Sequence, residues 1–133
     1  MTVDLEMARW LKEQGFPQDR FPQIVWVGRK SSSDSTNWTC EARNFQPRHA
    51  GSLQGIHRTG NIEYGPCIAA PDPRIALEWL EREKGIDWWR QSPRMRAVKE
   101  HWFAATHDQK WVKGAATASG LLLEIKYYME AKA

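Results

Sequence analysis

The start of the chain carries apolar side chains at helical spacing, with polar ones between them. This pattern predicts a helix over residues 3–15, with Thr2 or Asp4 as its N-cap. The run IVWVG within residues 23–29 is rich in β-branched and aromatic side chains, which predicts a central strand. Residues 38–42, WTCEA, alternate between two faces, and we expect them to pair with the first strand as a hairpin.

The second half of the chain is predicted to be mainly helical. After a third turn and strand in HRTGNIEYG, Asp72 is the N-cap of a helix that ends at Gly85. Apolar residues at helical spacing predict another helix over residues 93–106 and a last one over residues 116–131. Residues 107–114 are expected to form a loop or a short strand.

Consecutive strands joined by loops argue against a doubly wound parallel sheet. We therefore expect an α+β fold, in which a small antiparallel sheet of about three to four strands is packed by an N-terminal helix and two to three C-terminal helices. The length of 133 residues lies within the usual range of one domain, so residues 1–133 are expected to form a single domain.

The apolar runs and the cysteines indicate the cellular compartment in which the protein is expected. No run approaches the roughly 18 apolar residues of a membrane span, and the start carries acids where a signal peptide is basic and then apolar. Cys40 and Cys67 form no CxxC pair, which favours free thiols in a reducing, cytoplasmic setting. A disulfide between the two stays open at this point.

No familiar catalytic or metal-binding motif occurs in the chain. The His and Cys residues lack the short spacings of structural zinc sites, and GxSxG, GxGxxG, HExxH and a Walker loop are missing from the sequence. We expect no catalytic residues, no metal and no cofactor. A small hydrolase or nuclease with a dispersed site is the least favoured alternative, with His49 or His57 as its general base.

Two stretches without acidic residues, 42–62 and 88–99, carry the candidate binding groups. In the first, glycines let a backbone approach an anion that Arg side chains bind; in the second, Trp rings stack on bases while Arg side chains meet phosphates. The plainer interpretation of the first stretch is a solvent-exposed loop, and that of the second is the solvent-exposed side of a helix. The candidate ligand-binding residues are Arg43, Arg48, His49, His57, Arg58, Trp88, Trp89, Arg90, Arg94 and Arg96.

Two features of the composition bear on these stretches. Eight Trp residues are many for this length, and they belong either to an aromatic core or, in part, to a partner surface. The net charge of +3 permits an anionic partner without requiring one.

The organisation of the chain resembles that of short proteins encoded by bacteriophages and prophages. The resemblance lies in Trp-rich strands joined to AAPDPRIALEWLEREKGI and in a Leu- and Ala-rich helix near the end, TASGLLLEIKYYMEA. It covers residues 23–86 and the last helix, without a diagnostic motif. It implies an accessory protein of a mobile element in the cytoplasm of a bacterial host, such as an inhibitor of host defence.

These observations favour a non-catalytic binding protein. We expect it to engage a host protein, or to sequester an anionic ligand such as a nucleotide, through a basic, Trp-containing surface, and to form a homo-oligomer. The alternative is a nucleic-acid-binding protein that uses the same two stretches.

Overall fold

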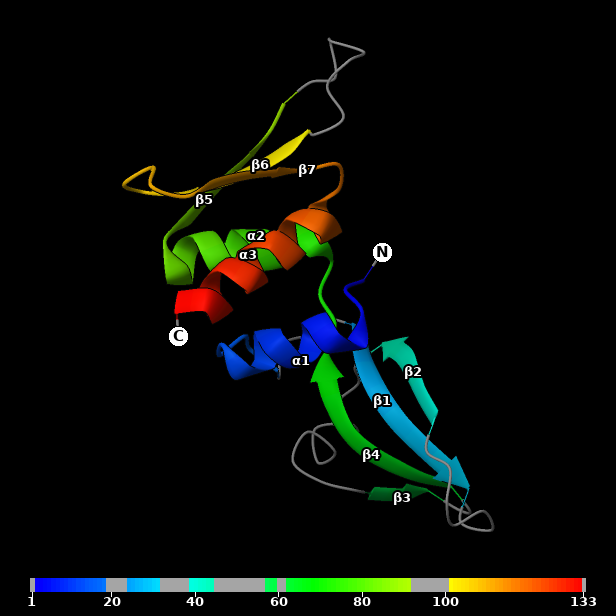
Figure 1. The fold of residues 1–133 in the computed structure, drawn as a ribbon. Coiled ribbons are helices and arrows are strands. Elements are labelled where there is room, and N and C mark those ends of the chain that lie inside the picture. Colours follow the sequence, from blue (N-terminus) through cyan, green and yellow to red (C-terminus); the bar gives the residue numbers. More distant parts are fainter. Residues whose placement is uncertain are drawn as a thin grey trace. The chain divides into compact units, whose positions relative to one another are not determined.

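The fold of the chain is α+β, as the sequence predicts, and it is built from three helices and two antiparallel sheets in the described residues (Figure 1). The chain divides into two compact units, the N-terminal unit of residues 2–71 and the C-terminal unit of residues 72–133. The single domain expected from the length stays a prediction. This computed structural model describes residues 2–18, 24–31, 39–44, 57–59, 62–91 and 101–132.

The N-terminal unit holds a four-stranded sheet in the order β2-β1-β4-β3. Strand β1 pairs antiparallel with β2 on one side and β4 on the other, so the predicted central strand and its hairpin are confirmed. The register between β1 and β4 shifts between Val27 and Arg29, as at a β-bulge. The elements of this unit are α1 (Leu5–Glu13), β1 (Ile24–Ser31), β2 (Thr39–Asn44), β3 (His57–Thr59) and β4 (Ile62–Ala69).

Helix α1 begins at Leu5, two residues after the predicted start, because Asp4, one of the two predicted N-caps, caps it. The Asp4 carboxylate accepts a hydrogen bond of 2.8 Å from the backbone N–H of Met7. The chain before the helix is also fixed: the N–H of Val3 donates to the carbonyl of Pro71, and the indole N–H of Trp26 donates to the carbonyl of Val3 over 3.0 Å. The buried helical residues are Met7, Ala8, Trp10 and Leu11.

The two cysteines lie on strands that flank β1 from opposite sides. Cys40 in β2 is opposite Gly28, and Cys67 in β4 is opposite Val27. Two strand spacings amount to about 9.6 Å, whereas the Cα atoms of a disulfide lie at most about 7 Å apart. In this register the Cα atoms of the two cysteines are therefore too far apart for a disulfide, which the sequence left open.

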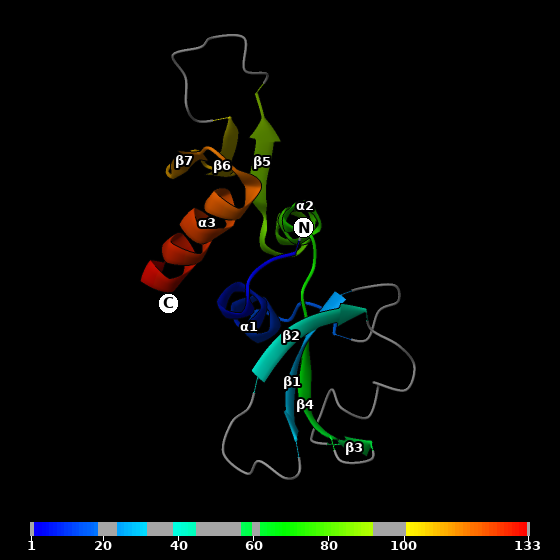
Figure 2. The same ribbon diagram turned by 90° about the vertical axis from the view of Figure 1, so that its right-hand side faces the viewer.

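The C-terminal unit is a two-layer arrangement of a three-stranded sheet, in the order β5-β6-β7, and two helices. The helices contact each other and the strands, and both views show them on one face of the sheet (Figures 1 and 2). In the described part of this unit, no helix lies on the opposite face. Its elements are α2 (Pro73–Lys84), β5 (Ile86–Arg90), β6 (Trp102–Thr106), β7 (Val112–Ala115) and α3 (Ala118–Lys132).

Helix α2 begins and ends at the predicted caps, whereas α3 begins two residues later than predicted. The Asp72 carboxylate accepts from the N–H of Arg74 over 2.9 Å at the start of α2, and Gly85 ends that helix in the left-handed region with φ 69°. The buried residues of the two helices are Pro73, Ala76, Leu77, Trp79, Leu80, Leu121, Leu122 and Ile125. None of the helices in the described ranges is long and apolar enough to cross a membrane.

The prediction of a helix over residues 93–106 is wrong for the part that the structure describes, because Trp102–Thr106 form strand β6. Strand β6 lies between β5 and β7, and Trp102, Ala104 and Ala105 are all buried. Apolar residues occupy both faces of β6, with Trp102 and Ala104 on one and Phe103 and Ala105 on the other. This removes the alternation of apolar and polar positions that marks a strand, so the spacing of apolar residues resembled that of a helix. Residues 92–100 lie outside the described residues.

Candidate binding face

Strand β5 sends neighbouring side chains to opposite faces of the three-stranded sheet, as an extended strand must. Ile86 is buried and Trp88 half-buried on the side of the helices, whereas Asp87 and Trp89 lie on the other side. The open face is the face away from α2 and α3. It is formed by Asp87, Trp89, Phe103, Ala105, Val112 and Gly114, which the strand register brings into two rows.

The centre of the open face is an aromatic pair. Trp89 lies directly opposite Phe103 in the ladder, and their rings stack with centroids 5.7 Å apart and an interplanar angle of 15°. Although it is stacked, Trp89 remains 37% exposed. The third position of this row is Gly114, so β7 places no side chain beside the ring of Phe103. The pair is therefore a flat and accessible apolar surface.

Polar groups border this pair along the strands. One row further, the sheet hydrogen bonding continues from the N–H of Gln91 to the carbonyl of His101 over 2.8 Å. Gln91 is exposed and His101 is half-buried. On the other side of the pair, the Asp87 carboxylate lies 3.0 Å from Nδ1 of His107. Groups that donate and accept hydrogen bonds thus lie on both sides of the aromatic pair.

The helix-facing side of the same strands carries a second aromatic cluster. Trp88 stacks on Trp102 with centroids 5.9 Å apart, and the guanidinium of Arg90 lies over Trp102 at 5.0 Å. The indole N–H of Trp88 is buried and has no hydrogen-bond partner. The structure thus places the two tryptophans, which the sequence treats as one cluster, on opposite sides of the sheet.

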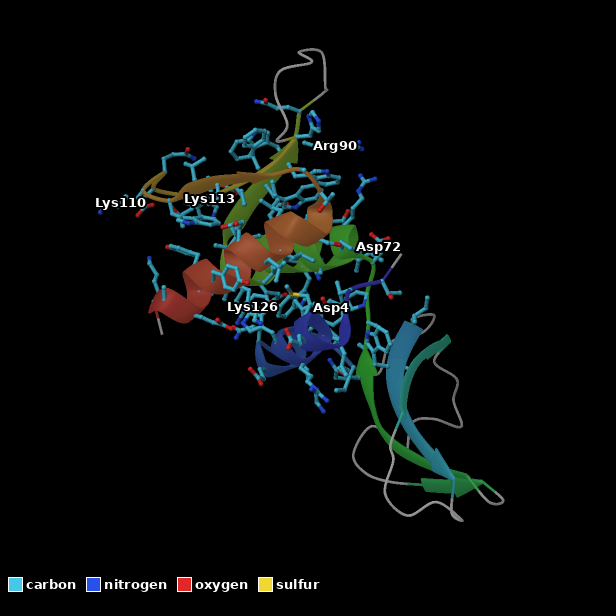
Figure 3. The ribbon with its side chains drawn as sticks, turned by 45° about the vertical axis from the view of Figure 1, so that its right-hand side comes forward. Asp4, Asp72, Arg90, Lys110, Lys113 and Lys126 are labelled. Carbon is cyan, nitrogen blue, oxygen red and sulfur yellow. The ribbon has the colours of Figure 1, made fainter. Side chains whose placement is uncertain are left out.

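Three exposed cations lie at the rim of the three-stranded sheet (Figure 3), and the register puts two of them, Arg90 and Lys113, on the side of Trp88 and Trp102. Arg90 ends β5, Lys110 lies in the turn between β6 and β7, and Lys113 lies on the edge strand β7. In the described parts of the chain, ion pairs join Arg82 to Glu83, His107 to Asp87 and Lys126 to Glu130. No carboxylate there pairs with any of the three cations around the sheet.

The other candidate residues lie in the N-terminal unit or outside the described residues. Arg43, His57 and Arg58 are on strands of the N-terminal unit, where Arg58 lies opposite Glu63 in the register. The acid-free stretch therefore has an acidic residue across the ladder. Four candidates, Arg48, His49, Arg94 and Arg96, lie outside the described residues.

A hollow of about 430 Å³ lies at one end of the C-terminal unit. Lys84 and Lys132 are in the last turns of α2 and α3, where a cation complements the helix dipole. The Tyr128 hydroxyl, as hydrogen-bond partner, raises the pKa of Lys132. The hollow is lined by Lys84, Gly85, Ile86, Thr106, His107, Asp108, Tyr128, Met129 and Lys132.

The acidic residue of this hollow is held by its own turn. The Asp108 carboxylate accepts hydrogen bonds from the Thr106 hydroxyl over 2.6 Å and from the N–H of Lys110 over 3.0 Å. These bonds, that of Thr106 first, lower the pKa of Asp108. The charged groups of the hollow are thus accounted for by helix ends and a turn, which leaves the open face as the candidate site.

Comparison of the chain with protein-family models, with curated proteins and with solved structures finds no match in any of the three. Within the described ranges, His, Cys, Asp and Glu side chains form no group of three that could hold a metal ion. The sequence had singled out Trp89, but Phe103 was assigned to a helix. Only the strand assignment of residues 102–106 brings Phe103 beside Trp89.

Proposed function

We propose that the chain is a non-catalytic binding protein that contacts its partner with the open face. The observation that carries this proposal is the stacked pair of Trp89 and Phe103, which stays accessible on a sheet face without a helix. Aromatic residues, and Trp above all, are enriched among the side chains that dominate binding energy. Val112, 49% exposed in the adjacent row, extends the apolar surface.

Exposed cations at the rim of the sheet, and not on the open face itself, support an anionic ligand or a partner with an acidic surface. Arg90 and Lys113 lie on the edge strands at positions that share the helix-facing side, and Lys110 lies in the turn between β6 and β7. In line with the resemblance to phage and prophage proteins, we propose that the partner is a host protein or an anionic ligand in the bacterial cytoplasm. A homo-oligomer belongs to the same proposal, and size-exclusion chromatography with light scattering tests it.

Capture from a bacterial lysate tests the role of the open face. The tagged wild-type chain is compared with Trp89→Ala and with Tyr127→Ala, which removes a ring of similar kind, 57% exposed, from α3. Captured protein and captured nucleic acid are measured separately. We expect Trp89→Ala to lose the specific capture and Tyr127→Ala to keep it. Capture that is the same for all three chains would contradict the proposal.

A further inference from the structure

We infer that the open face binds an arginine side chain of a partner protein, with the guanidinium stacked on the indole of Trp89 and next to the carboxylate of Asp87. This inference rests on the function proposed above and names the group of the partner that the open face recognises. It depends on the charge of the open face, on its rings and on a guanidinium–indole contact elsewhere in the same sheet.

The open face carries a carboxylate and no basic side chain of Lys or Arg. Asp87 lies two residues before Trp89 on β5, so the two side chains are neighbours on the same face of the sheet. Of the side chains that the described strands place on this face, Asp87 is the only acidic one. Its neighbour in the ladder is the small residue Ala105, and the Asp87 side chain is 40% exposed. The open face therefore attracts a cationic group.

The Asp87 carboxylate has an oxygen available for such a group. Its Oδ2 atom lies 3.0 Å from Nδ1 of His107, and in the described part of the chain no group is bonded to its Oδ1 atom. His107 thus holds one oxygen in place and leaves the second for a group that approaches the open face.

The rings of the open face suit a planar cation. Phe103 stacks on Trp89 at an interplanar angle of 15°, which orients the indole, while Trp89 stays 37% exposed. A planar guanidinium can stack on an indole and still direct N–H groups from its edge to a carboxylate. Two nearly parallel rings do not enclose a ligand from several sides, as aromatic cages for methylated ammonium groups do. The arrangement therefore favours arginine over lysine or a quaternary ammonium.

The other side of the same sheet already contains a contact of this kind. The guanidinium of Arg90 lies over the ring of Trp102, 5.0 Å from its centroid, where Trp88 also stacks. Within the described ranges, no cation of the chain itself lies over the ring of Trp89. The exposed indole is thus available to a guanidinium from another molecule.

The surroundings of the pair indicate a protein as the source of the guanidinium. A small free cation gains only a modest free energy from one exposed ring and one exposed carboxylate. A protein adds contacts with Val112, which is 49% exposed on the same face. Lys110 and Arg90 at the rim would repel a surface that is basic throughout. The partner is therefore expected to present its arginine within an otherwise acidic or neutral surface.

The test is an NMR titration of the isotope-labelled full chain with N-acetyl-arginine methylamide, which carries the guanidinium without the rest of a partner. The indole N–H signal of Trp89 is assigned by its loss in Trp89→Phe. We expect the arginine derivative to shift this signal, and N-acetyl-lysine methylamide, of the same charge, to shift it less. Asp87→Asn is expected to weaken binding of the arginine derivative roughly threefold, within the range for an exposed ion pair.

His107→Ala is the matched control for Asp87→Asn. Both substitutions remove the contact between Asp87 and His107, but only Asp87→Asn removes the carboxylate, so His107→Ala is expected to keep the binding. Circular dichroism melting curves show whether each variant is folded. In the capture experiment, Asp87→Asn is expected to lose the captured protein as Trp89→Ala does, and the arginine derivative is expected to compete with it.

Four results would overturn the inference: an indole signal that ignores the arginine derivative, an equal response to the lysine derivative, binding that a folded Asp87→Asn variant leaves unchanged, or an equal loss in His107→Ala. Capture of nucleic acid alone, or a dimer that Trp89→Ala dissociates, would show a different occupant and overturn it as well.

The function proposed above has a separate criterion. It survives each of these results if the wild-type chain captures a partner that Trp89→Ala fails to capture. It fails only if Trp89→Ala alters neither the capture of protein nor that of nucleic acid, so the two failures are distinguishable.

Discussion

The rings of Trp88 and Trp89 lie on opposite sides of the three-stranded sheet of the C-terminal unit. Trp88 stacks on Trp102 beside the helices, and Trp89 stacks on Phe103 on the open face. One peptide bond therefore separates a side chain that contributes to packing from one that is available for contact with a ligand.

Alanine substitutions should separate these two roles. We expect Trp88→Ala to lower the free energy of unfolding by about 3 kcal/mol, as for a large ring removed from a packed layer. Trp89→Ala should cost about 1 kcal/mol, mainly its stacking on Phe103, because much of the ring already meets water. Urea unfolding followed by circular dichroism measures both. Equal losses, or a larger loss for Trp89→Ala, would contradict this assignment of the two faces.

A side chain at Gly85 is expected to destabilise the folded protein. Its φ of 69° is left-handed, and a Cβ there would lie 3.2 Å from Nε2 of His107, whose ring is already tied to Asp87. The backbone conformation alone should make Gly85→Ala cost about 1–2 kcal/mol in thermal or urea unfolding. The same substitution in a His107→Ala background should cost less, because the contact with the ring is gone. An identical cost in both backgrounds would show that the ring contact contributes nothing.

The turn that holds Asp108 predicts a dependence of stability on pH. The hydrogen bonds from Thr106 and from the N–H of Lys110 keep the pKa of Asp108 below its ordinary value of 3.8, so the folded state favours the carboxylate. Their contribution to stability is therefore complete above that value and is lost as the pH falls through the lowered pKa. Thr106→Val should raise the pKa of Asp108 toward 3.8, which carboxyl NMR titration measures.

The difference in the free energy of unfolding between the wild type and Thr106→Val should accordingly become smaller at acidic pH. Part of it should persist at every pH, because the Thr106 hydroxyl also accepts a hydrogen bond of 3.3 Å from the N–H of Trp111. Chemical unfolding at a series of pH values tests this. A difference that stays constant down to strongly acidic solution would contradict the role of the carboxylate.

The two helix caps test whether the chain unfolds as one domain. Asp4 caps α1 in the N-terminal unit, and Asp72 caps α2 in the C-terminal unit. Asp4→Ala and Asp72→Ala should each cost about 1 kcal/mol. If residues 1–133 form a single domain, each substitution shifts the same cooperative transition in calorimetry. Two transitions, each responding to only one of the substitutions, would contradict the single domain.

Helix ends and alternating strands could be predicted here because their determinants are local. Asp4, Asp72 and Gly85 act on the backbone within one turn, and the apolar run of β1 requires pairing on both sides. Strand β6 could not be predicted in this way, since its conformation depends on ladders with β5 and β7 on both sides. Strand β5 followed a helix directly and was interpreted only as a basic cluster, although Ile86 and Trp88 alternate with Asp87 and Trp89.

The candidate site was only half visible in the sequence. Trp89 could be named because it stands in an acid-free stretch of Trp and Arg residues, but its partner Phe103 lies across a ladder that no local pattern shows. Gly114 acquires a role only through its place in the same row. A flat surface assembled from three strands is a property of the register, and the register was not predicted.

Strand β1 separates the strands that carry Cys40 and Cys67, so disulfide formation between them can be used to detect unfolding of the N-terminal sheet. While the sheet is paired in this register, the Cα atoms of the two cysteines stay farther apart than a disulfide allows. An intramolecular bridge can close only after β1 has left its place between its neighbours. A faster-migrating monomer on a non-reducing gel would therefore record chains that have opened at β1, and its rate of appearance would measure how often the N-terminal sheet comes apart.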